Sequence, residues 1–308
     1  SLPMSSSVDL NHLVFALSNT LDLVGVDDLH HSKRVAYMVR EMAKAKNLSI
    51  DTQDHYMQAA LLHDCGVSSS LAHEELLSNF DWQFSDDHCT RGFNLLMQSE
   101  QLKKFAFCVL FHHTHWKDLI YLEMQESCKI LTNTIFLCDR VDALMQNYLK
   151  DETEKYYLTA QSYVYDKLES LKGDFFSPEL VDTFIKMSKL ESFWFGFRED
   201  ILQRYYQKIL KKQNPLPIGV HHLHEIALLF ANFVDAKSHF TASHSINVAK
   251  VAHALALKMG LSEEVAQKLE IAGLLHDIGK LIIPDEILDK PSSLYTKRNM
   301  LLVKEIML

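Results

Sequence analysis

The sequence predicts an all-α fold built from two tandem helical bundles joined by a helical linker. Nine glycines and six prolines in 308 residues leave few residues for the turns of a sheet, and most segments carry apolar residues at a 3.6-residue period. One segment of 36 residues occurs twice, and the chain is long enough for two hydrophobic cores. We therefore expect a first domain over 1–190, a connecting helix and linker over 191–217, and a second domain over 218–308.

The expected helices follow from their caps and apolar faces. A helix from His31 ends near Asn47 and Ser49, and a second runs from about Thr52 to His63. Ser85 and the two aspartates after it predict the start of a helix that continues to Met97. Further helices are expected over 101–113, 129–148, 151–172, 178–190 and 201–210. The prolines at 215 and 217 resist helix and mark the end of the linker.

The repeat aligns His31–Gly66 with His244–Gly279 at a constant offset of 213 residues, and 13 of its 36 positions are identical. Both copies open with His-Ser and end in Leu-Leu-His-Asp-x-Gly. Helix packing requires only apolar residues at the right period, so it does not explain a histidine 32 residues before a His-Asp pair. Because histidine and aspartate are metal-ligand types, the repeat predicts two metal-dependent domains in tandem.

In the first copy the ligand types continue beyond the repeat. A single histidine on a helix is more often a surface or core residue than a ligand, but an ordered set with a duplicated first part favours a site. Seven donors suit a two-metal cluster, with Asp64 as the bridging carboxylate, and such a cluster can activate water and clamp a phosphate. The predicted ligands of the first site are His31, His63, Asp64, His88, His112, His113 and Asp139.

These residues resemble the HD superfamily of metal-dependent phosphohydrolases, and more closely its HD-GYP branch. The second copy is similar to that branch over Ile226–Leu294, which includes Leu-Leu-His-Asp-Ile-Gly-Lys at 274–280 and Lys290-Pro291. The first copy resembles a diverged but complete domain. The resemblance implies a phosphodiesterase for cyclic di-GMP or 3′3′-cyclic GMP-AMP. It also implies two divalent transition metal ions per complete site, Fe, Mn or Ni, with Zn as a further option.

The two copies depart from the family pattern in different ways. The first copy has Val67 where the family has a lysine, and no Gly-Tyr-Pro loop follows its histidine pair. The second keeps Lys280 but, in this sequence, lacks the later ligands. We therefore expect the second domain to catalyse in the intact protein, with His244, His276 and Asp277 on metal and Lys280 on the phosphate. The first domain would be regulatory, and the 308-residue form a weak or inactive enzyme.

Two other functions fit part of the sequence. A non-catalytic signalling scaffold would use both domains to bind ligands or partners. A nucleotide monophosphatase would explain the His-Asp pairs but not Lys290-Pro291. For the phosphodiesterase, we also expect that the chain forms a homodimer or binds a signalling protein.

Bulk composition excludes other classes. A net charge of −9 argues against DNA or RNA binding, and the apolar runs are too short for a membrane span. Five cysteines without close-paired spacing predict reduced thiols and a cytoplasmic protein.

Overall fold

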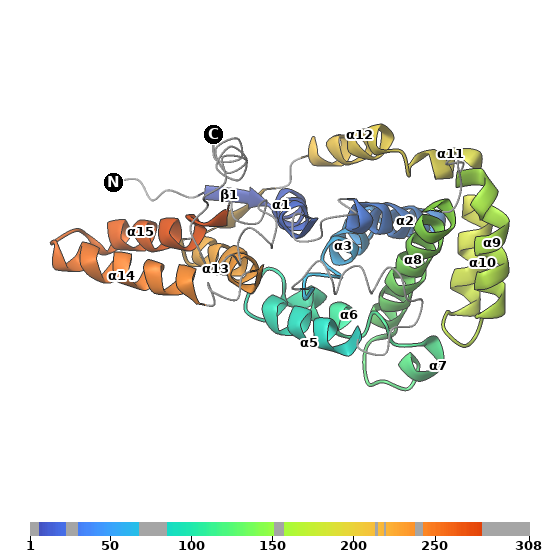
Figure 1. Cartoon of the computed structure of the whole chain (residues 1–308), viewed down its shortest axis with the longest axis horizontal. Helices are drawn as coiled ribbons and strands as arrows, with labels where there is room; N and C mark the ends of the chain where they lie inside the picture. The colour runs from blue at the N-terminus through green and yellow to red at the C-terminus, as the bar shows by residue number, and fades with distance from the viewer. Residues whose placement is uncertain are drawn as a thin grey trace, which may run out of the picture.

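The computed structural model describes residues 6–22, 30–67, 85–150, 157–212, 215–218, 220–237 and 243–278. Within these ranges the chain is almost entirely helical, which confirms the predicted all-α class (Figure 1). No described helix combines the length and the apolar character needed to cross a bilayer.

The helices form one large assembly and a smaller one at its end (Figure 1). The first part contains α1 (Leu10–Asp22), α2 (His31–Ala45), α3 (Ile50–Leu61), α5 (Ser85–Leu96), η1 (Lys103–Phe105), α6 (Ala106–Leu110), α7 (Trp116–Leu119), α8 (Glu126–Lys150), α9 (Tyr157–Ser170), α10 (Pro178–Ser188), α11 (Glu191–Phe195) and α12 (Glu199–Leu210). The second contains α13 (Val220–Lys237), α14 (His244–Lys258) and α15 (Glu263–Leu275).

Two details differ from the sequence-based expectation. The helix expected over 101–113 is shorter, because η1 and α6 end at Leu110 and the histidine pair follows in a turn. In addition, β1 (Ser6–Asp9) pairs antiparallel with β2 (Pro215–Ile218), from Ser6 opposite Ile218 to Asp9 opposite Pro215. The prolines therefore lie in a short two-stranded ribbon, a position that sheet structure permits at an edge.

The sequence repeat is also a structural repeat. Helices α2 and α14 have the same length and begin at the two repeat histidines, and both are followed by a residue with positive φ, Asn47 at 54° and Gly260 at 81°. Ser49 then caps α3 through the Thr52 N–H, and Ser262 caps α15 through the Val265 N–H. Local sequence thus builds the same helix–turn–helix twice.

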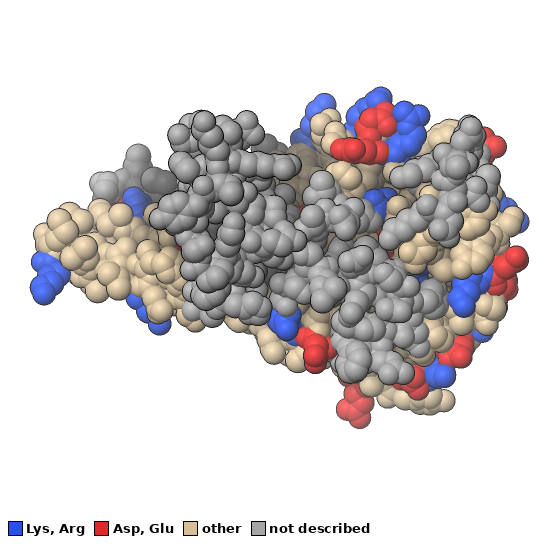
Figure 2. Space-filling model, in the orientation of Figure 1, with Lys and Arg blue, Asp and Glu red and all other residues tan. Residues whose placement is uncertain are grey.

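The two copies differ in what covers them. In the first copy Met38 and Met42 are fully buried in the main core, which includes Leu137 and Cys138 of α8. Their equivalents Val251 and Leu255 are 66% and 54% exposed. On the face shown in Figure 2, few charged side chains are in view over α14 and α15. Among the described residues, the second helix pair lacks the apolar cover that the first has.

The segment after α10 packs into the first part of the molecule. Tyr37 of α2 donates to the Phe193 carbonyl, and the Tyr206 hydroxyl donates to the Lys33 carbonyl. Trp194 is buried and donates its indole N–H to Ser188. Helices α11 and α12 therefore share the core of the first bundle. They also hold α2, the helix that begins at His31, in place.

Candidate metal centre

The seven predicted ligands of the first site come from five separate segments and meet at one place. His31 begins α2, His63 and Asp64 lie in the turn after α3, and His88 lies on α5. The histidine pair at 112–113 follows α6, and Asp139 lies in the middle of α8. All of these side chains are buried except that of His113, which is half-buried.

Asp64 lies between two groups of histidines. One carboxylate oxygen, Oδ2, is 3.2 Å from His63 Nε2 and 3.6 Å from His31 Nε2. The other, Oδ1, is 3.6 Å from Nε2 of both His88 and His112. Each oxygen thus faces its own pair of nitrogens, the arrangement needed for a carboxylate that bridges two ions.

Hydrogen bonds on the far side of the rings fix the direction of three of these imidazoles. His63 Nδ1 donates to the Ala60 carbonyl and His112 Nδ1 to the Val109 carbonyl, both at 2.6 Å. His31 Nδ1 donates to Asp142 Oδ2 at 2.7 Å. Since Nδ1 carries the proton in each neutral ring, the Nε2 lone pair points toward Asp64. Such outer bonds orient the histidine ligands of metal sites.

Two carboxylates, those of Asp139 and Asp142, and two guanidinium groups, those of Arg140 and Arg34, lie next to His31. Arg140 donates to Asp139 Oδ2 at 2.8 Å, while Asp139 Oδ1 faces His31 Nε2 at 3.1 Å. Arg34 donates to both oxygens of Asp142, at 2.6 and 2.9 Å. Both arginines are buried. With Asp64 included, the buried carboxylates exceed the guanidinium groups by one negative charge.

The pKa shifts separate a charged group, formed by Asp64, Asp139 and His63, from a neutral imidazole at His88. Burial raises the pKa of Asp64 and of Asp139, but His63 and Arg140 outweigh it and hold both well below the usual range. Burial lowers the pKa of His63, but the negative charges of Asp64 and Asp139 outweigh burial and raise this pKa to about 9. Burial and the neighbouring His112 lower the pKa of His88 to about 3.

These donors fit divalent metal ions. Nε2 of His63 and Nδ1 of His88 are buried and make no hydrogen bond to the described residues. Nε2 of His88 and Nε2 of His112 are only 3.3 Å apart, and both lie 3.6 Å from Asp64 Oδ1. A divalent cation bound by both nitrogens would satisfy the two lone pairs.

The second copy repeats the first three ligands and, among the described residues, no more of the set. His276 Nε2 is 3.2 Å and His244 Nε2 is 3.4 Å from Asp277 Oδ2, and His276 Nδ1 donates to the Gly273 carbonyl at 2.6 Å. These values match those of His63, His31 and Asp64. The His244 side chain is 46% exposed, against 1% for His31. Lys280 lies outside the described residues.

Sequence reasoning missed several members of the first site. Cys89 lies within 4.8 Å of the histidine group at 88, 112 and 113, with its sulfur 3.5 Å from His112 Nδ1. Asp142 and Arg34 orient His31, and Arg140 holds Asp139. The available signal was helical spacing, because Asp139 and Asp142 lie three residues apart on one face of α8.

Comparisons with known proteins agree with this geometry. The sequence pattern of the HD domain family matches residues 28–144 and 241–307, which contain the two repeat copies. A protein of Vibrio cholerae, 3′3′-cGAMP-specific phosphodiesterase 1, is 36% identical over 96% of this chain and 68% of its own length. The 3′3′-cGAMP-specific phosphodiesterase 3 of the same organism is 34% identical over 67% of this chain and 43% of its own length.

A more distant relative and a solved structure extend the comparison. A cyclic di-GMP phosphodiesterase of Thermotoga maritima is 25% identical over 52% of this chain and 44% of its own length. The crystal structure of a cyclic GMP-AMP specific phosphodiesterase of Vibrio cholerae superposes with a TM-score of 0.66. That likeness covers 97% of this chain and 78% of the other at 22% identity, so it supports the fold alone.

Proposed function

This chain belongs to the HD domain family, and we propose on that basis that it is a metal-dependent phosphodiesterase that opens cyclic dinucleotides. The preferred substrate in this proposal is 3′3′-cyclic GMP-AMP, because the relative that matches 96% of the chain is named for it. Cyclic di-GMP is the second candidate, since three shorter matches are to cyclic di-GMP phosphodiesterases.

The observation that carries the proposal is the position of Asp64, each of whose oxygens faces two imidazole nitrogens at 3.2–3.6 Å. His31, His63 and Asp139 would hold one ion, and His88, His112 and His113 the other, with Asp64 shared. In a copy that cleaves substrate, two such ions would supply an activated water and neutralise a phosphodiester, with Fe, Mn or Ni preferred and Zn usable. Arg140 holds Asp139 in place by a hydrogen bond, and Asp142 does the same for His31.

We further propose that the two copies have different roles. The first site, buried and with Val67 after its His-Asp motif, would be a metal centre that supports the protein. The second copy would catalyse, with Asp277 and Lys280 at the phosphate. The lysine supports this division, because Lys280 can stabilise phosphate charge and its counterpart in the first copy is Val67.

The test measures metal content and cleavage in the protein as its gene encodes it. Loaded with Mn²⁺ or Fe²⁺, the protein should convert cyclic GMP-AMP to a linear dinucleotide faster than it converts cyclic di-GMP. Asp277→Ala should remove the cleavage while the metal at the first site stays. A protein that binds metal and cyclic dinucleotide but cleaves neither substrate is the signalling scaffold, and that result would overturn the enzyme proposal.

A further inference from the structure

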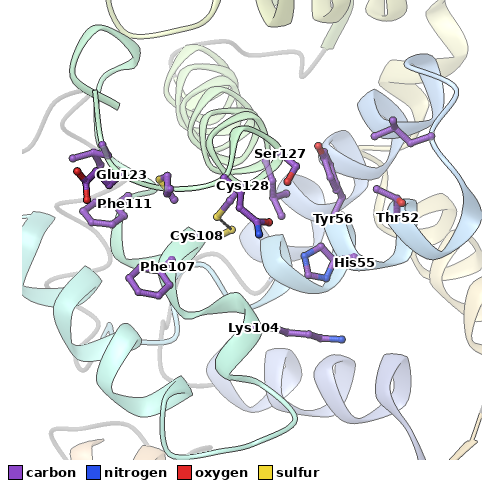
Figure 3. A pocket seen from close by; sticks show the side chains of 15 residues that line it. Thr52, His55, Tyr56, Lys104, Phe107, Cys108, Phe111, Glu123, Ser127 and Cys128 are labelled. Carbon is purple, nitrogen blue, oxygen red and sulfur yellow. Dashed lines mark hydrogen bonds between the residues drawn. The ribbon is translucent and has the colours of Figure 1, made fainter. Parts of the chain in front are cut away.

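A second feature of the first bundle lies apart from the metal centre. A cavity of about 800 Å³ opens between α3, α6 and the N-terminal end of α8. It is lined mainly by apolar side chains, and its size is within the range of small-molecule sites. Figure 3 shows two cysteine sulfurs close together in its wall, from Cys108 of α6 and Cys128 of α8.

The two thiols are arranged for reaction with each other. Their sulfurs are 3.3 Å apart, so an approach of about 1.3 Å reaches the length of a disulfide bond. Both line the cavity, but Cys128 is half-buried whereas Cys108 is only 1% exposed. A small molecule in the cavity can therefore reach Cys128, while Cys108 can be reached from Cys128.

We propose that Cys108 and Cys128 form a redox-modification site at which a small hydroperoxide oxidises the pair to a disulfide. The Cys128 thiolate attacks one peroxide oxygen, the O–O bond breaks, and a proton from solvent converts the released oxyanion to an alcohol or water. Cys128 is then a sulfenic acid. The Cys108 thiol attacks its sulfur, the S–O bond breaks and water leaves, so two sulfurs lose two electrons and one peroxide gains them.

The thiol chemistry agrees with these roles. The hydrogen bond from Cys108 outweighs burial and lowers the pKa of Cys128 to about 7, and the same bond raises the pKa of Cys108. A thiolate is the nucleophilic form, so Cys128 is the attacking thiol and Cys108 the resolving thiol. Cys65 and Cys138 are buried, and burial raises the pKa of each thiol.

The pair also links two elements of the metal centre. Cys108 lies four residues before His112, and Cys128 lies on the helix that carries Asp139. A disulfide would cross-link α6 to α8, the helix that also carries Asp139. The modification is independent of the phosphodiesterase proposal, because it requires only the two thiols and the oxidant.

The test treats the folded, Zn²⁺-loaded 308-residue chain with hydrogen peroxide, since zinc has no redox chemistry of its own. Peptide mapping without reduction should recover a 108–128 disulfide, lost again on treatment with a small dithiol. Cys108→Ser retains a hydrogen-bond donor but no resolving thiol, so Cys128 should accumulate as sulfenic acid that a dimedone-type probe traps. Cys128→Ser should leave Cys108 reduced.

The three remaining cysteines are the internal control, and they should oxidise at least tenfold more slowly than Cys128. Thermal unfolding of each variant, followed by circular dichroism, verifies that it is folded before treatment. Oxidation of Cys128 to a sulfinic acid in the unmodified chain without pairing would overturn the proposal. Equal oxidation rates at Cys128 and at the buried Cys138 would overturn it as well.

Discussion

Gly66 and His88 lie in direct backbone contact. A Cβ added at Gly66 would be 1.8 Å from the His88 carbonyl oxygen and 2.5 Å from the Gly92 nitrogen. The glycine of the first His-Asp-x-Gly motif therefore allows α5 to approach the turn that carries His63 and Asp64. This close approach brings His88 to 3.6 Å from Asp64.

Gly66→Ala should displace α5 and separate His88 from the rest of the site. We expect metal bound at the first site to fall from two ions toward one, as measured by elemental analysis, because the group of His31 and His63 does not depend on α5. The control is Gly173→Asn, a position with φ of 83° and no atom near an added Cβ, which asparagine tolerates. Two ions retained in Gly66→Ala would show that α5 adjusts without loss of the ligand.

Asp64→Ala should remove both ions of the first site, since each group of histidines uses one oxygen of this carboxylate. Asp277→Ala is the matched control at the equivalent position of the second copy, and it should leave these two ions bound. Elemental analysis of the folded variants makes the comparison. If Asp64→Ala retains one tightly bound ion, Asp64 belongs to one group only and does not bridge.

Asp142→Asn should weaken metal binding although Asp142 is not a predicted ligand. Its carboxylate orients His31 and neutralises Arg34, and loss of such an outer partner lowers metal affinity by about 10–100-fold. Competition with a chelator measures the affinity. Asp182→Asn changes an exposed carboxylate on α10 and should leave affinity unchanged. Equal affinities of Asp142→Asn and the unmodified chain would contradict the positioning role.

Metal binding should release protons at neutral pH. In the metal-free protein the pKa of His63 is about 9, above the unfolded value of about 6.5, so the folded state holds this proton more tightly. The stabilisation is fully present below pH 6.5 and is lost as pH rises through about 9. The melting temperature of the metal-free chain should therefore fall between pH 6.5 and 9.5, and that of the metal-loaded chain should fall less. The opposite ranking would mean that His63 is neutral without metal.

Lys280→Ala should lower the turnover of cyclic GMP-AMP by roughly 10²-fold or more in the protein as its gene encodes it, while metal content stays unchanged. A lysine three residues after Asp277 can protonate the leaving oxygen or stabilise phosphate charge. Lys258→Ala, at the exposed end of α14, is the control and should retain full turnover. Normal turnover in Lys280→Ala would assign this lysine no part in the reaction.

Much of the site could be predicted because its information is local. The caps Ser49 and Ser262 and the helix ends at Asn47 and Gly260 follow from side-chain and backbone chemistry within a few residues. The ligand types recur in order along the chain, so the seven residues of the first set could be selected without knowing how the helices pack. The same local rules favoured helix throughout and missed the β1–β2 pair, whose strands lie about 200 residues apart.

The sequence by itself determined the helices, the repeat and the types of ligand, since each depends on neighbouring residues or on the chemistry of one side chain. Only the tertiary structure decided which atoms face each other. The contacts from Asp142 to His31 and Arg34 span 111 and 108 residues, and no periodicity encodes them. Packing also decided the burial of the first copy, because the core that includes α8 closes over Met38. Burial, and with it the electrostatics of each site, arises from these distant contacts.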